Sequence, residues 1–182
     1  MKGKYFFVVQ RIIEKLHKVP RTGYVDRGVK DPETVGEHTD EMILIAEELF
    51  HIPGLTTMLK IHDWAESNKK IGDRRTDSLC PPDKRWTKEK KYKAELRAMK
   101  NICSRLGPYG PRILRLWLEF EEKRTWRAKI ANQIDKFQMI RKAIRYQIAG
   151  QPVIAQEFID HDGPKITNYL LSFELTKARL KL

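Results

Sequence analysis

The sequence is poor in cysteine and contains no long hydrophobic run. Only Cys80 and Cys103 occur among its 182 residues, and their spacing is not that of a metal-ligand pair. We expect two reduced thiols, which are typical of a reducing compartment, and therefore a cytoplasmic protein. The longest apolar stretches, such as residues 42–46, are too short to cross a bilayer, and residues 6–9 are too few for a signal-peptide core. Neither a membrane span nor a secretion signal is expected.

The sequence also lacks the long apolar and polar alternation that a β-sheet requires. Apolar residues recur instead at helical spacing, between proline and glycine residues that interrupt the pattern. The predicted helices cover roughly residues 4–18, 34–50, 54–69, 87–106, 109–122, 125–149 and 165–180. Two loops are predicted at 20–32 and 72–86, and 150–163 is a further irregular stretch with room for a short helical turn. The predicted fold class is all-α.

The chain carries an excess of positive charge. Its 36 basic and 24 acidic residues give a net charge of +12, which favours anionic partners such as nucleotides or nucleic acid. Much of the excess lies between residues 84 and 93, where a solvated helix face is the simpler explanation. No aromatic-rich strand pattern or RNA-binding signature accompanies the charge, so a nucleic-acid partner is not expected.

Four ionisable residues fall on apolar faces of three predicted helices. His38 starts one apolar stripe, His62 continues another and is followed by Asp63, and Asp135 lies within a third. A lone histidine on an apolar face is more often a hydrogen-bonded core residue, and a His-Asp pair also occurs by chance. A divalent metal explains all four residues at once, because a buried carboxylate needs a compensating cation.

The sequence around these residues resembles that of the HD-domain phosphohydrolase superfamily, and in particular its 5′-deoxynucleotidase branch. The similar segments are LHKVPRTGYVDRGVKDPETVGEHTDEM, KIHDWAE and LWLEFEEKRTWRAKIANQIDKFQMI, which together span roughly residues 10–150. The resemblance implies an all-α bundle around one metal, and release of phosphate from deoxynucleoside 5′-monophosphates. We therefore expect one HD domain over residues 1–182, with a motif-bearing core at about 10–150 and a C-terminal helical extension at about 151–182.

The expected cofactor is one divalent transition metal held by His38, His62, Asp63 and Asp135. Mixed nitrogen and oxygen ligands suit Mn²⁺, Co²⁺, Fe²⁺, Ni²⁺ or Zn²⁺ better than Mg²⁺. Members of the superfamily with two metals use extra histidines after the His-Asp pair. No histidine occurs here between His62 and His161, so we predict a mononuclear site.

Glu66 and Asp73 are the candidate catalytic residues. One helical turn would place Glu66 on the same face as His62 and Asp63, in a position for general acid/base catalysis. The alternative for Glu66 is an exposed helix carboxylate. Asp73 resembles a second acidic residue of the family, although the Glu-to-Asp separation of seven residues is longer than the family's and indicates an insertion near residues 69–70.

Arg21 and Tyr24 are the candidate substrate-binding residues. Arg21 resembles the family's phosphate-binding arginine, a role that suits a permanent charge with a planar donor group. Tyr24 stands where the family has an aromatic residue, commonly tryptophan, near the sugar. Glu37 and Thr39 flank the first ligand as its hydrogen-bond partners, or Glu37 is a solvated carboxylate. Surface or capping positions are expected for the remaining histidines, His17, His51 and His161.

Two other functions stay open at this point. The same site accepts another nucleotide or a phosphodiester in the second hypothesis, and in the third the metal is structural in a binding module without catalysis. A homodimer is expected, because the family is commonly dimeric and a C-terminal stripe offers apolar surface beyond the motif-bearing core. The stripe consists of Ile166, Leu170, Phe173 and Leu175.

Overall fold

The computed structural model describes residues 3–182, and helices make up the regular structure in that range. The helices are α1 (Gly3–Leu16), α2 (Thr22–Val25), α3 (Val35–Leu49), α4 (Leu55–Ile61), α5 (Lys88–Ser104), α6 (Gly110–Glu122), α7 (Trp126–Ile148), α8 (Ala155–Asp162) and α9 (Tyr169–Arg179). Short 3-10 turns lie at η1 (Trp64–Ser67), η2 (Gly107–Tyr109) and η3 (Gly163–Lys165). Among the described residues no helix is both long and apolar enough to cross a bilayer. The predicted all-α class is confirmed.

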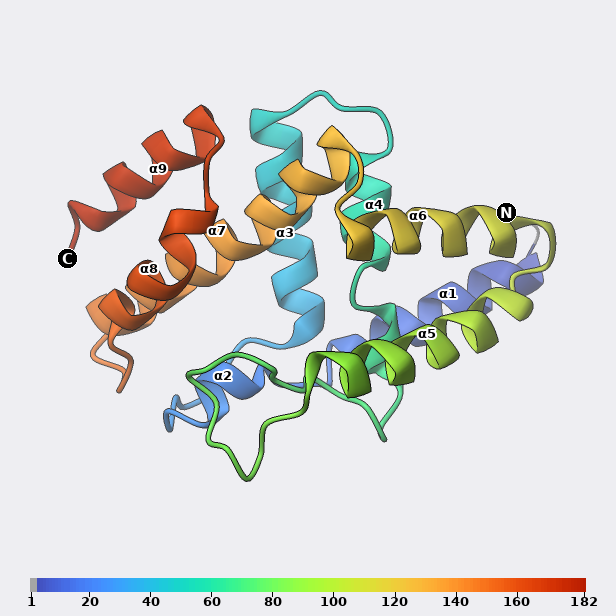
Figure 1. Ribbon diagram of the computed structural model, residues 1–182, viewed down its shortest axis with the longest axis horizontal. Helices are drawn as coiled ribbons and strands as arrows, with labels where there is room; N and C mark the ends of the chain where they lie inside the picture. The colour runs from blue at the N-terminus through green and yellow to red at the C-terminus, as the bar shows by residue number, and fades with distance from the viewer. Residues whose placement is uncertain (1–2) are drawn as a thin grey trace.

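Two apolar clusters hold the helices together. Residues of α3, α4, α7, α8 and α9 form one cluster, around side chains such as Met42 and Ile134. Residues of α1, η1, α5 and α6 form the other, around Met99 and Trp117. In Figure 1, α8 and α9 lie on one side of the central helices α3 and α7, and α1, α5 and α6 lie on the other. The end of α4 contributes to both clusters, so the His-Asp pair follows the point where they meet.

The start of α3 is defined by a capping box. The Thr34 hydroxyl accepts a hydrogen bond from the backbone N–H of Glu37, and the Glu37 carboxylate accepts one from the backbone N–H of Thr34. The hydrogen bond from Thr34 lowers the pKa of Glu37. Glu37 is thus a capping residue of the helix that carries His38, and its contact with the backbone sets where the first turn begins.

The predicted helix at 54–69 is broken at the His-Asp pair. Helix α4 ends at Ile61, Asp63 has φ −102° and ψ 15°, and a 3-10 turn follows. The Glu66 N–H donates to the carbonyl oxygen of Asp63 at 3.0 Å, an i to i+3 bond. In a 3-10 turn the side chains of residues three positions apart lie on the same face. Glu66 therefore lies on the face of Asp63 rather than on that of His62. The predicted single α-helix was wrong here, although Glu66 remains beside the pair.

The C-terminal region is more helical than the sequence indicated. Residues 155–162 form α8, because Ala155, Phe158 and Ile159 bury one face against the core shared with α7. Helix α9 begins only at Tyr169, where the Asn168 side chain accepts a hydrogen bond from Leu171 N–H. A helix of eight residues between two irregular segments gives a weak periodic signal, and its packing on α7 stabilises it.

Candidate metal centre and active site

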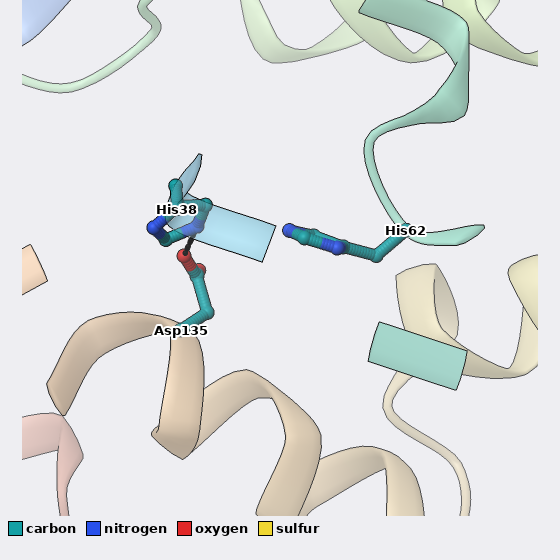
Figure 2. Close-up of side chains that lie close together, drawn as sticks. All are labelled: His38, His62 and Asp135. Carbon is teal, nitrogen blue, oxygen red and sulfur yellow. Dashed lines mark ion pairs between the residues drawn. The ribbon is translucent and has the colours of Figure 1, made fainter. Parts of the chain in front are cut away.

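Three of the predicted ligands come together from three helices. His38 in α3, His62 directly after α4 and Asp135 in α7 offer ligand atoms that all lie within 4.8 Å of one another. His38 Nε2 is 3.3 Å from Asp135 Oδ1, the contact drawn as a dashed line in Figure 2. Both imidazoles are buried, with 0% and 5% of their surface exposed. This is the convergence that the separate apolar stripes predicted.

Hydrogen bonds orient both imidazoles for metal binding. His38 Nδ1 lies 2.5 Å from Gln138 Oε1, and His62 Nδ1 lies 2.6 Å from the carbonyl oxygen of Leu59. Each partner is an acceptor, so each Nδ1 carries a proton, and Nε2 is left as the nitrogen that can give a lone pair to a cation. Both Nε2 atoms are buried and make no hydrogen bond, although each faces a carboxylate oxygen. The donor set therefore fits a divalent cation, which would satisfy both lone pairs.

Asp63 lies beside this group. Its Oδ2 is 2.9 Å from His62 Nε2 and 3.7 Å from Arg21 Nη1. Burial would raise the pKa of Asp63, but His62 and Arg21 lower it far below its usual range. Burial also opposes ionisation of Asp135, yet Lys136 and His38 hold the pKa of that carboxyl low. Both carboxyl groups are therefore anionic and available to a cation.

Arg21 reaches the ligand group from the loop before α2. The backbone bridge between Pro20 and Thr34 closes this loop, and Arg21 N–H donates to the carbonyl oxygen of Glu33 at 2.9 Å. The guanidinium lies 3.7 Å from Asp63 and 3.8 Å from Asp73. Burial lowers the pKa of Arg21, but these carboxylates outweigh burial and raise that pKa above its usual value. A buried permanent cation next to a candidate metal site is well placed to hold a phosphate oxygen.

Asp73 connects the two predicted loops at 20–32 and 72–86. Its Oδ2 accepts a hydrogen bond from Thr22 N–H at 2.6 Å, and its carbonyl oxygen accepts one from the Thr22 hydroxyl at 2.5 Å. These bonds place Asp73 beside Arg21 in spite of the longer spacing from Glu66. The observed contacts are those of a residue that positions Arg21 and the start of α2.

Tyr24 is a core residue with one edge at the cavity. It is 1% exposed, its hydroxyl donates to the carbonyl oxygen of Met139 at 2.7 Å, and its ring stacks on Phe158 with the planes 22° apart. The phenol group is therefore already engaged within the protein. Tyr24 offers ring surface, and no free hydroxyl, to a substrate.

The site occupies a cavity of about 640 Å³. Its walls include residues of both predicted loops, and it contains Arg21, Tyr24, Asp63, Glu66, Asp73 and Asp135. Helices α5, α7 and α8 contribute Lys91, Lys136 and His161. The cavity thus brings together the carboxylates of Asp63 and Asp135, the guanidinium of Arg21 and several further charged side chains.

Glu66 lies on the buried side of the site. Its carboxyl is 1% exposed, Oε1 lies 3.0 Å from Lys91 Nζ, and Oε2 is buried without a partner. Burial raises the pKa of Glu66, and the charge of Asp63 raises it further. A buried carboxyl group that holds its proton more tightly than usual can serve as a general acid or base. The alternative of an exposed helix carboxylate was wrong.

Several site residues lay outside the sequence prediction. Lys91 belongs to the charged stretch expected to be a solvated helix face, and that expectation was wrong for this residue. Lys136 Nζ lies 2.8 Å from Asp135 Oδ2, and Gln138 orients His38. Gln138 follows Asp135 by three residues on α7, so helical spacing alone carried a signal for it. No such signal marks Lys91, whose direction depends on how α5 packs on η1.

Three further residues near the site have defined contacts or positions. Thr39 bonds to the carbonyl oxygen of Val35 within α3. Arg27 donates to Gly23 and Glu157 and lies over the Phe158 ring, so it braces α2 against α8. His161, expected at the surface or in a cap, is part of the cavity wall.

The fold and the site define an all-helical domain with a buried His/His/Asp group fit for a divalent metal. A family model described as HD domain matches residues 13–166, and the chain belongs to this family. The 5′-deoxynucleotidase HDDC2 of Mus musculus is 32% identical over 165 residues, which cover 87% of this chain and 78% of the mouse protein. The 5′-deoxynucleotidase HDDC2 of Dictyostelium discoideum is 35% identical over 150 residues, which cover 75% of each chain.

A solved structure has the same fold. The PH0347 protein from Pyrococcus horikoshii OT3 superposes with a TM-score of 0.72 at 22% identity, covering 94% of this chain and 96% of the other. The resemblance to the HD-domain superfamily inferred from three motifs is therefore confirmed by the family match.

Proposed function

We propose that this protein is a metal-dependent 5′-nucleotidase that hydrolyses deoxynucleoside 5′-monophosphates to deoxynucleosides and phosphate. The observation that carries the proposal is the pair of buried Nε2 atoms of His38 and His62, which make no hydrogen bond and face Asp135 and Asp63, with Arg21 at 3.7 Å from Asp63. Relatives named 5′-deoxynucleotidase at about a third identity support the choice of substrate.

The proposed cofactor is one divalent transition metal, held by His38, His62, Asp63 and Asp135. When bound, such an ion polarises a phosphate oxygen and activates water as a nucleophile. Two imidazole nitrogens and two carboxylates favour Mn²⁺, Co²⁺, Fe²⁺, Ni²⁺ or Zn²⁺.

The chain's own residues supply binding and proton transfer. Arg21 holds the phosphate through charge-assisted hydrogen bonds, and Asp73 and Thr22 hold Arg21 in place. Glu66, at the deep wall of the cavity, passes a proton between solvent and the reacting oxygens. Tyr24 gives apolar ring surface for the deoxyribose. Excluding water from this buried pocket strengthens each electrostatic contact with the phosphate.

A phosphate-release assay tests the function. The protein is stripped with a chelator, reloaded separately with each of several divalent metals, and offered a panel of deoxynucleoside and ribonucleoside 5′-monophosphates. We expect activity on the deoxynucleotides that depends on added metal. Absence of phosphate release from every nucleotide with every metal would overturn the proposal.

The assembly we propose is a homodimer formed through α9. The sequence stripe divides in the structure, since Ile166 and Leu175 are buried in the core, whereas Leu170 and Phe173 are 42% and 52% exposed. Neighbouring Tyr169 is 78% exposed and stacks on Phe173. Light scattering at micromolar concentration tests this, and a monomer mass would contradict it.

A reducing cytoplasm is the proposed location, supported by two buried free cysteines.

A further inference from the structure

A buried chain of hydrogen bonds leads from His38 away from the cavity. Gln138 on α7 is 0% exposed, and its Oε1 lies 2.5 Å from His38 Nδ1. The other end of the same amide, Nε2, donates to Glu33 Oε2 at 3.0 Å and to Glu41 Oε2 at 3.2 Å. Gln138, Glu33 and Glu41 do not line the cavity, so this chain lies behind the candidate metal centre.

The two carboxylates set which end of the Gln138 amide faces His38. Ionised carboxylate oxygens only accept hydrogen bonds, so they bind the donor end of the amide and leave Oε1 for the imidazole. In the opposite orientation Oε1 would lie against two carboxylate oxygens with no proton between them. With Oε1 as its partner, Nδ1 of His38 carries a proton and Nε2 is left for the metal. The ligand nitrogen of His38 therefore depends on acids that lie two hydrogen bonds away.

Glu33 is the more deeply buried of these two acids. It is 3% exposed, its Oε2 lies 3.4 Å from Lys142 Nζ, and its Oε1 is buried without a hydrogen-bond partner. Glu41 is only partly buried and also pairs with two arginines of α7. A buried carboxylate with one unsatisfied oxygen costs stability, so a purely stabilising role does not account for Glu33. Its hydrogen bond with Gln138 gives it a different role.

The backbone of Glu33 is fixed on both sides. Its carbonyl oxygen accepts from Arg21 N–H at 2.9 Å, and its N–H donates to the hydroxyl of Tyr146 on α7 at 2.7 Å. Glu33 is thereby held between α7 and the loop that carries Arg21. Because the main chain is held in this way, the carboxylate has a defined position from which to orient Gln138.

We propose that Glu33 is a positioning residue of the metal centre, which acts on His38 through Gln138. This inference rests on the proposed metal-dependent function and extends the centre beyond the ligands and their direct partners. Glu33 holds the amide so that His38 keeps its proton on Nδ1 and offers Nε2 to the cation. Without this acceptor only Glu41 holds the amide, and its oxygen faces His38 for less of the time.

The Zn²⁺ affinity of three variants tests the proposal, measured by competition with a metal-binding dye after chelator stripping. Glu33→Met loses the acceptor, and we expect the affinity to fall about 3- to 10-fold, the effect of one hydrogen bond. Glu33→Gln loses the charge but keeps an acceptor oxygen, so its affinity should stay within about twofold of wild type. The control Glu47→Met removes an exposed carboxylate from α3 and should behave as wild type.

A double-mutant cycle shows whether the effect passes through Gln138. In the Gln138→Met background, which has no amide to orient, Glu33→Met should cause no further loss of affinity. Additive losses, equal losses in Glu33→Met and Glu33→Gln, or unchanged affinity in Glu33→Met would each overturn the role.

Two checks keep these results interpretable. Thermal melting shows that each variant is folded, and Glu33→Leu takes the place of Glu33→Met if the latter does not fold. The titration needs no nucleotide. A wild type that binds Zn²⁺ but releases no phosphate with any metal would therefore contradict the proposed nucleotidase and leave the role of Glu33 standing.

Discussion

Lys91 Nζ lies between two buried carboxyl groups, 3.0 Å from Glu66 Oε1 and 3.5 Å from Glu95 Oε1. The lysine comes from the first turn of α5, and both carboxyl groups are buried. Burial raises the pKa of Glu66 and of Glu95, and Lys91 opposes this effect on each. Lys91 therefore compensates negative charge on both carboxyl groups in the wall behind the candidate metal centre.

Replacing Lys91 should destabilise the fold strongly. In Lys91→Met two buried acids lose their cation, and removing one partner of a buried ion pair costs about 3–5 kcal/mol. The matched control is Lys93→Met on the same helix, where the pair with Glu89 is exposed and worth less than about 1 kcal/mol. Urea unfolding at pH 7 measures both, and equal free energies of unfolding for the two variants would contradict the buried role of Lys91.

Loss of a ligand should abolish metal binding and activity together. In His62→Ala or Asp135→Ala the remaining donors no longer match the cation, and the remaining buried carboxylate loses its compensation. Metal analysis after reloading and dialysis should find little bound metal, whereas His51→Ala should retain it. Full occupancy in both ligand variants would disprove the assignment.

Gln138 should act on the metal through His38. Gln138→Met keeps side-chain volume but removes the acceptor at His38 Nδ1, 2.5 Å away. Loss of such an orienting partner typically lowers metal affinity about 10- to 100-fold. A competition titration with a metal-binding dye measures the change, with Gln156→Met on the exposed face of α8 as control. Unchanged affinity would mean that Gln138 does not act on the metal through His38.

Two variants should separate proton transfer from phosphate binding. Glu66→Gln keeps the shape of the side chain and should retain metal while lowering kcat about 10²- to 10⁴-fold. Arg21→Ala should mainly raise KM, because it removes a charge that holds the phosphate in both ground and transition states. Near-normal turnover of metal-loaded Glu66→Gln would transfer the acid/base role elsewhere.

Glu121 should make the stability depend on pH between about 4.5 and 7. Burial, with the charges of Glu95 and Asp63, raises the pKa of Glu121 to about 7. The folded state then binds more protons than the unfolded state in this window, so the free energy of unfolding falls as pH rises. Glu121→Gln should remove that fall and stabilise the protein at pH 8 by roughly 1–3 kcal/mol. Parallel pH profiles for variant and wild type would contradict this.

Much of the site was predictable from residue order alone. His38, His62 and Asp135 each interrupt an apolar helical face, and such residues point inward wherever the helices pack, so the burial of each followed from local periodicity. That they meet at one site was expected because a buried carboxylate needs a compensating cation. The all-α class followed from the same spacing. Glu66 was predictable as a neighbour of the His-Asp pair, since either helical geometry leaves it within one turn.

Other features depended on tertiary packing. Lys91 lies in a stretch whose sequence indicates solvent-facing charge, and His161 lies in one predicted to be irregular. Both enter the cavity because α5 packs on η1 and α8 packs on α7. Asp73 reaches Thr22 across 51 residues through a loop that carries no periodic signal. Local periodicity specifies the face of a helix, whereas the contacts between distant segments depend on how the helices and loops finally assemble.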